Sequence, residues 1–196
     1  MKLIIISGRS GSGKSIALRA LEDLGYYCVD NIPVNLLPAL THSILGEYED
    51  VAVSVDVRNL PKESNELPEI LNFLPEDWNV SIVYLDSSTN VLLKRYSETR
   101  RLHPLSKGNQ SLEAAIRLEK QLLEPMQERA DLCIDTDQLT VHQLAEIIRE
   151  RILGKKSSRL VLVFESFGFK YGIPKDADYV FDARFLPNPH WEPDLK

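Results

Sequence analysis

The amino-acid sequence predicts an α/β protein built on a doubly wound parallel sheet. Over residues 1–153, short apolar segments typical of buried strands alternate with longer amphipathic segments typical of helices. Such alternation predicts βαβ units, which form parallel sheets with helices on both faces. In this class of sheet the functional groups lie at the carboxyl ends of the strands. Four of the expected strands are followed directly by an aspartate: Asp30, Asp56, Asp86 and Asp135.

Each expected strand is a short run of apolar and β-branched residues bounded by turn-forming residues. The strands are expected at residues 3–6, 26–29, 51–55, 80–85 and 132–134. Each expected helix has apolar residues at helical spacing. Gly25 follows the first helix, and Thr140 with Gln143 forms a capping box at the start of the last. The helices are expected at residues 16–24, 34–45, 66–74, 90–99, 111–129 and 140–153.

A glycine-rich motif lies directly behind the first strand. It matches G-x-x-x-x-G-K-S, and its residues are Gly8, Arg9, Ser10, Gly11, Ser12, Gly13, Lys14 and Ser15. Its glycines allow backbone N–H groups and a helix N-terminus to surround a polyphosphate, while Lys14 reaches the terminal phosphates and Ser15 binds Mg²⁺. The alternative is a glycine-rich turn with an incidental Lys-Ser pair, which the order strand, loop, helix disfavours. We therefore predict a P-loop kinase-like fold that binds a nucleotide.

A second magnesium ligand is expected at the end of a strand, because P-loop proteins commonly use an aspartate there. Asp56 and Asp86 are the two candidates. We favour Asp56, since Arg58 and Asn59 beside it supply a cation and an amide suited to phosphate or base recognition. The alternative for either aspartate is a role in a turn or a helix cap.

Arg95, Arg100 and Arg101 form the densest cationic cluster of an otherwise acidic region. Arginines beside a nucleotide neutralise charge that develops on a transferred phosphoryl group. Helical spacing separates Arg95 from the other two, so we expect Arg100 and Arg101 to form a lid element and, with Lys14, to be the candidate catalytic groups. The alternative is a solvated cationic helix end, which the helix dipole also favours.

The charge of the chain argues against a generally basic surface for nucleic acid. The formal net charge is −6, and residues 1–153 hold 16 Lys and Arg against 23 Asp and Glu, whereas residues 154–196 hold 7 against 6. No apolar run is long enough to span a bilayer and no signal peptide is visible, so we expect a cytoplasmic protein without membrane contact. Cys28 and Cys133 lie in apolar segments and are expected to be buried, reduced thiols.

Two domains are expected. Residues 1–153 form the P-loop domain, and residues 154–196 begin a second domain with a polar linker at 154–158 and strands at 160–164 and 179–181. So short a segment cannot form an independent core, so we expect the second domain to be incomplete.

Two histidines, His103 and His190, lie beside prolines in polar loops. Asp182 is near His190 in sequence, which makes that region a candidate ligand site. For both histidines, packing in a proline-rich turn is the common alternative.

Several segments together resemble the RapZ family of bacterial nucleotide-binding adaptor proteins. The resemblance covers nearly the whole chain and is carried by residues 7–15, 17–23, 27–31, 56–59, 95–105 and 163–191. The sequences RRLHPL at 100–105 and FLPNPHW at 185–191 are far more specific than the glycine-rich loop. The resemblance implies an N-terminal P-loop domain and a C-terminal domain that senses an amino-sugar phosphate and binds RNA.

The resemblance also implies residue roles. Residues 8–15 would bind ATP, and Asp182 with His190 would help to bind the sugar phosphate. A GTP-associated element would consist of Asp56, Val57, Arg58 and Asn59. Family members continue past residue 196 with a Lys- and Arg-rich terminus that contacts RNA, so RNA binding is expected to need that part.

Three functions remain open on the sequence. The residues alone favour a P-loop kinase of a small metabolite, with an acceptor site near Asp30. The resemblance favours a regulatory adaptor that presents a small regulatory RNA to RNase E and so controls glucosamine-6-phosphate synthase, with weak ATP or GTP hydrolysis at most. A vestigial oligomerisation platform is disfavoured, because Lys14 and Ser15 are intact. The resemblance decides for the adaptor, which we expect to be a homo-oligomer.

Overall fold

The computed structural model describes residues 1–61, 66–106, 111–153, 167–171, 179–182 and 184. The chain divides into two compact units, residues 1–157 and 158–196. Among the described residues of the second unit, Phe169–Tyr171 form the 3₁₀ turn η3. The strand expected at 179–181 is wrong: these residues have no regular structure, because so short a run needs a paired strand to form one. The expected linker at 154–158, the strand at 160–164 and His190 lie outside the described residues.

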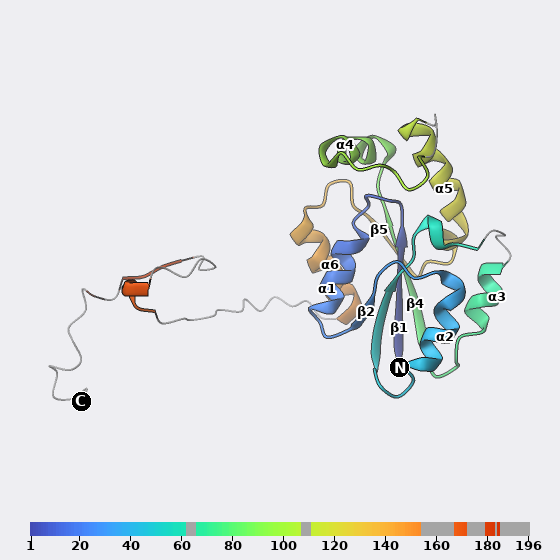
Figure 1. Cartoon of the computed structure of the whole chain (residues 1–196), viewed down its shortest axis with the longest axis horizontal. Helices are drawn as coiled ribbons and strands as arrows, with labels where there is room; N and C mark the ends of the chain where they lie inside the picture. Colours follow the sequence, from blue (N-terminus) through green and yellow to red (C-terminus); the bar gives the residue numbers. More distant parts are fainter. Residues whose placement is uncertain (62–65, 107–110, 154–166, 172–178, 183, 185–196) are drawn as a thin grey trace. The chain divides into compact units, whose positions relative to one another are not determined.

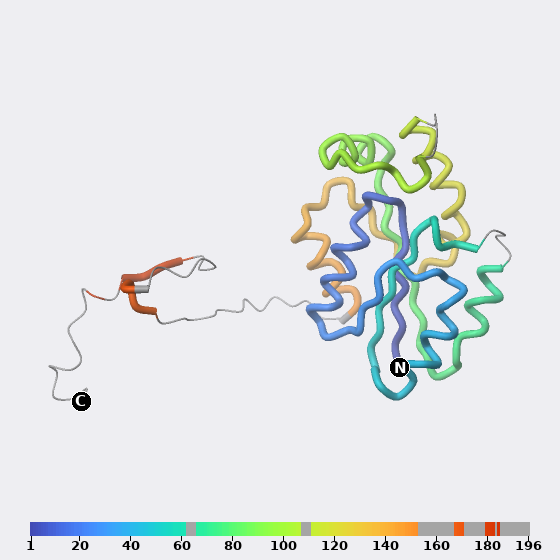
Figure 2. The backbone as a smooth tube through the Cα atoms, viewed as in Figure 1, coloured from blue at the N-terminus to red at the C-terminus, as the bar shows by residue number. Residues whose placement is uncertain are grey.

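Unit 1 is built on a five-stranded parallel sheet with the strand order β2-β3-β1-β4-β5. The strands are β1 (Lys2–Gly8), β2 (Tyr27–Val29), β3 (Asp50–Ser54), β4 (Asn79–Asp86) and β5 (Leu132–Asp135). In Figure 2 the trace of β1 starts at the N-terminus and runs through the middle of this unit. The doubly wound parallel sheet expected from the sequence is thus confirmed.

Helices cover both faces of the sheet. They are α1 (Lys14–Glu22), α2 (Leu37–Ser43), α3 (Glu66–Asn72), α4 (Thr89–Thr99), α5 (Leu112–Glu128) and α6 (Val141–Leu153), with 3₁₀ turns η1 (Val34–Leu36) and η2 (Val57–Asn59). Figure 1 shows α1 and α6 on one side of the sheet, α2 and α3 on the other, and α4 beyond the carboxyl ends of the strands. None of the helices in the described part of the chain is both long and apolar enough to cross a bilayer.

The alternating side chains of β1 divide the core into two clusters. Ile4 and Ile6 pack with α1 and α6, whereas Leu3 and Ile5 pack with α2, α3 and α5. All four side chains are fully buried. A strand buried on both faces needs apolar residues at every position, which explains the uninterrupted apolar run at the start of the chain.

The helix expected at 34–45 is shorter than the pattern suggested. The segment begins as the 3₁₀ turn η1, and α2 starts only at Leu37, with Pro38 in its first turn. Proline lacks a backbone N–H and fixes φ, so it suits the first helical turn and is unfavourable further inside a helix.

The two cysteines differ from the expectation that both are buried. Cys133 is exposed, because β5 is an edge strand whose buried side chain is Ile134. Cys28 is half-buried, and burial raises the pKa of its thiol to about 11. Both are free thiols.

Ile5→Ala is expected to lower the free energy of unfolding by about 2–5 kcal/mol, because it leaves a cavity in the middle of the sheet. Phe73→Ala is the control, since the Phe73 side chain is 71% exposed and its removal opens no cavity. Urea denaturation followed by tryptophan fluorescence measures both variants. Equal losses in the two variants would contradict the assignment of β1 to the core.

Candidate functional site

The glycine-rich loop joins β1 to α1 and leaves the start of the helix open. Gly8, Gly11 and Gly13 have φ values of 138°, 89° and 107°, which residues with side chains rarely adopt. A Cβ on Gly8 would lie 2.1 Å from the backbone oxygen of Leu85. Gly13 is the N-cap of α1 and supplies no side-chain cap. The N–H groups of Ile16 and Ala17 bond to the Gly13 oxygen, so those of Lys14 and Ser15 are left for an external acceptor. This geometry suits an anion.

Lys14 folds back over the loop. Its Nζ donates to the backbone oxygens of Gly8 at 2.7 Å and Arg9 at 3.2 Å. Burial lowers the pKa of the Lys14 ammonium group, and the carboxylates of Glu119 and Asp56 oppose this effect. A phosphate at the loop would add negative charge beside the ammonium and favour its charged form.

A cavity of about 610 Å³ opens beside the loop. Its walls combine the loop with η2, the end of α4, the segment that follows α4, and the start of α6. Besides Lys14, it is lined by Arg58, Arg95 and Arg101, which come from three different segments. Both the size and the cationic lining suit a phosphorylated small molecule.

The three arginines of the cationic cluster are placed differently from the expectation, which put Arg100 and Arg101 at the ligand and Arg95 apart from them. Arg95 lines the cavity and donates to the backbone oxygens of Gly11 at 2.9 Å and Thr136 at 2.6 Å. Arg101 lines the cavity too, but Arg100 does not belong to its described lining. Arg100 ends α4 in a left-handed conformation with φ of 52°, and it is exposed. Arg95 and Arg101 therefore come together at the cavity, and the Arg100–Arg101 pair is split.

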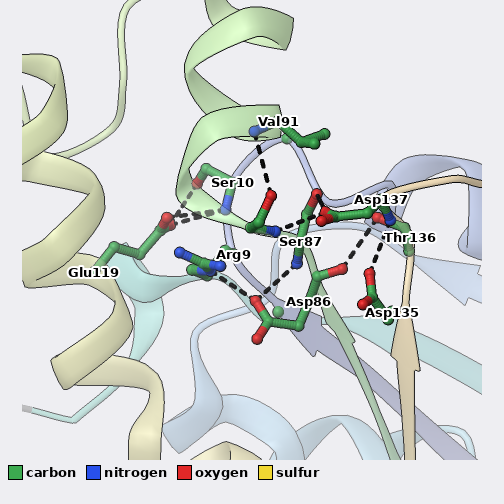
Figure 3. Close-up of polar contacts among 12 residues, drawn as sticks. Arg9, Ser10, Asp86, Ser87, Val91, Glu119, Asp135, Thr136 and Asp137 are labelled. Atoms are coloured by element: carbon green, nitrogen blue, oxygen red, sulfur yellow. Dashed lines mark hydrogen bonds and ion pairs between the residues drawn. The ribbon is translucent and has the colours of Figure 1, made fainter.

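The two candidate magnesium aspartates hold different partners. Asp86 Oδ1 accepts a hydrogen bond from Nε of the buried Arg9 at 2.7 Å, as Figure 3 shows. Asp56 accepts from the backbone N–H of Arg58 at 2.8 Å and from its Nε at 2.9 Å. Asp56 lines the cavity together with Ser15, whereas Asp86 is not part of that lining. Of the two aspartates, Asp56 is therefore the one that lies at the cavity.

The oxygen atoms of Ser15 and Asp56 suit Mg²⁺, a hard cation that takes one or two protein ligands together with waters and phosphate oxygens. Within the described ranges, no group of three or more His, Cys, Asp and Glu side chains is placed to hold a metal by itself. These residues therefore fit a magnesium ion that binds together with a polyphosphate.

A polar cluster joins the ends of β2 and β3. Ser54 Oγ donates a short hydrogen bond to Asp30 Oδ1 and accepts the N–H of Asn31 at 2.7 Å. Asn59 Nδ2 donates to the backbone oxygen of Asn31 at 2.9 Å. Val57, the first residue of η2, is buried. The segment that the resemblance assigned to GTP is thus fixed to the end of β2, where the acceptor site was expected.

Sequence reasoning missed Thr136 and Asp137, which follow β5. Thr136 accepts a hydrogen bond from Arg95 at its Oγ1 and donates its backbone N–H to the backbone oxygen of Asp86 at 2.9 Å. Asp137 Oδ1 accepts from Ser87 Oγ at 2.6 Å, one of the contacts in Figure 3 between the segments that follow β4 and β5. This hydrogen bond is the main cause that lowers the pKa of Asp137. The sequence feature that could have indicated these two residues is a threonine between two aspartates, directly after an expected strand.

Glu119 was missed as well. It lies on α5, is fully buried, and accepts hydrogen bonds from the N–H of Ser10 at 3.0 Å and from its Oγ at 2.6 Å (Figure 3). Its Oε2 lies 3.1 Å from His103 Nε2. Burial raises the pKa of the Glu119 carboxyl, but hydrogen bonds from His103 and Ser10 outweigh burial and lower the pKa below its ordinary value. The available signal was a single charged residue on the apolar stripe of α5, between Ile116 and Leu123.

In the second unit, Asp182 pairs with Arg184. Its Oδ1 accepts from the Arg184 Nε at 2.9 Å, and this bonding lowers the pKa of Asp182 to about 2. The guanidinium of Arg184 lies over the Phe169 ring, 4.2 Å from its centroid. His190, the other residue of the expected sugar-phosphate site, lies outside the described residues.

Comparison with known proteins supplies the family. A model of the RapZ-like N-terminal domain matches residues 1–156, and a model of the RapZ C-terminal domain matches residues 160–196. The chain belongs to the RapZ family. A curated relative from Pseudoalteromonas atlantica is 79% identical over the whole chain, which covers 70% of that relative, and one from Vibrio cholerae is 59% identical, with 69% covered. Both relatives carry the name nucleotide-binding protein.

Solved structures agree with the fold. Shikimate kinase from Acinetobacter baumannii, solved in complex with shikimate, matches with a TM-score of 0.53 at 22% identity, covering 80% of this chain and 95% of that one. Shikimate kinase from Bacteroides thetaiotaomicron matches with a TM-score of 0.52 at 15% identity, covering 77% and 98%. The RapZ-family chain therefore has a P-loop kinase-like fold, as its sequence predicted.

Glu119→Gln is expected to make this RapZ-family fold less sensitive to acid. Because the folded-state pKa of Glu119 is lowered, its ionised carboxylate stabilises the fold above its unfolded-state pKa, and this contribution is lost as the pH falls below about 5 towards the folded-state pKa. The free energy of unfolding of the variant is also expected to be about 1–3 kcal/mol lower than that of wild type at neutral pH.

Urea denaturation across the acid range measures this pH dependence. Glu124→Gln is the matched control, because Glu124 lies on the same helix and is exposed. If Glu119→Gln and Glu124→Gln show the same dependence of stability on pH, the ionised state of the buried carboxylate is refuted.

Proposed function

We propose that this protein binds a nucleoside triphosphate at residues 8–15, with ATP as the ligand of the loop. The observation that carries the proposal is the position of Lys14, whose ammonium group bonds to the loop backbone. Lys14 begins a helix that has no side-chain cap, and it lines the cavity together with three arginines. The backbone N–H groups of the loop and the Lys14 ammonium would together hold the phosphates. The name carried by the relatives supports this proposal.

Lys14→Ala is expected to abolish ATP binding and leave the fold intact, because it removes the one side chain of the loop that supplies a positive charge to the terminal phosphates. Titration calorimetry measures the affinity, and circular dichroism checks the fold. Lys120→Ala is the control, since Lys120 is an exposed lysine of α5. Unchanged ATP affinity in Lys14→Ala would sink the assignment of the phosphate loop.

Mg²⁺ would be held by Ser15 and Asp56 together with phosphate oxygens. Asp56, Val57, Arg58 and Asn59 would form a GTP-associated element. Hydrolysis of ATP or GTP would be weak, with Lys14, Arg100 and Arg101 as candidate catalytic groups; Arg95 joins this set on the geometry, because it lines the cavity beside Arg101. When bound, the metal would neutralise phosphate charge.

We further propose that the nucleotide regulates an adaptor. In this proposal, residues 1–153 form the nucleotide-binding domain and residues 154–196 begin a domain that senses an amino-sugar phosphate through Asp182 and His190. The protein, a cytoplasmic homo-oligomer, would present a small regulatory RNA to RNase E and so control glucosamine-6-phosphate synthase. Membership of the RapZ family supports this role. A ligand switches such a protein only if it binds two states unequally.

The adaptor proposal predicts RNA binding that depends on chain length. This chain and a chain extended to the length of the Pseudoalteromonas atlantica relative are titrated with the small regulatory RNA at one fixed salt concentration, because salt governs such affinities. Binding by the longer chain supports the adaptor. No binding by either chain, together with phosphate transfer from ATP to a small metabolite, would favour a kinase instead.

The kinase is the second candidate, and one observation favours it. The cluster of Asp30, Asn31 and Ser54 joins the ends of β2 and β3, and Asp56 follows β3 two residues later. A carboxylate there is suited to orient a hydroxyl group of a phosphate acceptor. Asp30→Asn would then abolish phosphate transfer with little effect on ATP affinity, whereas in an adaptor it would change neither.

A further inference from the structure

A chain of buried hydrogen bonds runs from the phosphate loop to the segment after α4. Ser10 donates its N–H and its hydroxyl to Glu119, and the other oxygen of Glu119 lies 3.1 Å from His103 Nε2. The side chains of Glu119 and His103 are both fully buried. Three segments that are distant in the sequence therefore meet at one carboxylate.

The direction of each hydrogen bond follows from the backbone. His103 Nδ1 accepts the N–H of Leu105 at 3.1 Å, so this nitrogen carries no proton. The proton of the neutral imidazole is then on Nε2, which donates it to Glu119. Glu119 receives donors on both oxygens and gives none, as expected of an ionised carboxylate.

His103 anchors a segment whose neighbouring residues face the cavity. Arg101, Leu102 and Pro104 all line the cavity, while the His103 side chain between them is buried against Glu119 and packs beside Tyr96, with ring centroids 5.3 Å apart. The buried attachment of His103 therefore lies two residues from Arg101, in the same segment that lines the cavity.

The charge of the Glu119 carboxylate does not attract a phosphorylated ligand. A negative group behind a phosphate loop repels the ligand, and burying it costs free energy unless its hydrogen bonds are complete. Glu119 also occupies the N–H of Ser10, a loop donor that would otherwise be free for an anion. What these bonds achieve is a fixed spacing between the loop and the segment around His103.

We propose that Glu119 is a positioning residue that couples the segment 100–106 to the phosphate loop, so that Arg101 and the loop bind the same phosphorylated ligand. This inference rests on the proposed binding of ATP at residues 8–15. Glu119 itself does not touch the ligand. It acts through Ser10 on one side and through His103 on the other.

The test is a double-mutant cycle on ATP affinity, measured by titration calorimetry with Arg101→Ala, Glu119→Gln and the double variant. In the wild-type background, Arg101→Ala is expected to weaken ATP binding about tenfold, the loss of a hydrogen bond to a charged group. In the Glu119→Gln background the same change is expected to weaken it less than about twofold, because Arg101 is no longer held at the cavity.

The two proposals fail in different ways. If wild type binds ATP and the affinity losses of Arg101→Ala and Glu119→Gln multiply in the double variant, the coupling is overturned and nucleotide binding stands. If wild type binds no ATP, the proposed function fails, and the proposed coupling between Arg101 and the loop fails with it. Glu124→Gln is the control on the same helix, and Arg101→Ala is expected to keep its tenfold effect in that background.

A second pair of variants keeps the test decisive if Glu119→Gln does not fold. His103→Phe preserves an aromatic ring beside Tyr96 but cannot donate to Glu119, whereas His103→Gln offers an amide N–H in its place. The coupling predicts that Arg101→Ala loses its effect in His103→Phe and regains it in His103→Gln. If both backgrounds give the same effect, His103 has only a packing role and the proposal is overturned.

Discussion

The candidate site depends on how closely β1 approaches β4 at Gly8. A side chain there would meet the backbone oxygen of Leu85 at 2.1 Å, so the chain can leave the sheet at this point only without a Cβ. The loop then turns through left-handed glycines, and α1 starts at Lys14. The ammonium group of Lys14 returns to the oxygen of Gly8 itself. Because Gly8 has no side chain, the loop can form here, and the loop in turn positions the start of α1 and Lys14.

The sheet and the glycine-rich loop could be predicted because both depend on local sequence. An apolar strand buried on both faces and glycines at left-handed positions have few alternatives. The contact between Asp56 and Arg58 is equally local, since the two residues are two positions apart in the sequence. The partner of Asp86 is Arg9, which lies far from it in the sequence. Contacts of this kind are set by topology, and residue spacing does not reveal them.

Arg95, Glu119 and His103 illustrate the same limit. The rotation of α4 and the left-handed turn at Arg100 decide which arginines reach the cavity, and spacing along a single helix led to the wrong partner for Arg101. Glu119 was readable only as an anomaly on an apolar stripe, because its partners come from two other segments. The role of a buried charge depends on what surrounds it.

The loop separates two kinds of electrostatic surroundings. On its protein side, Arg9 is paired with Asp86, and Glu119 is satisfied by neutral donors. On its cavity side, the cations outnumber the carboxylates. Breaking a buried pair is costly, so the protein side resists rearrangement while the cavity side is free to respond to a ligand.

The contrast between the two cysteines has a practical consequence. The thiolate is the nucleophile in alkylation, and the raised pKa of Cys28 leaves very little thiolate near neutral pH. Cys133 is exposed on β5, two residues before Asp135, the aspartate that leads into the Arg95 contact at Thr136. A maleimide dye therefore attaches selectively at Cys133 without any engineered cysteine. The dye then lies on the edge strand β5, and the loop that follows β5 lines the cavity.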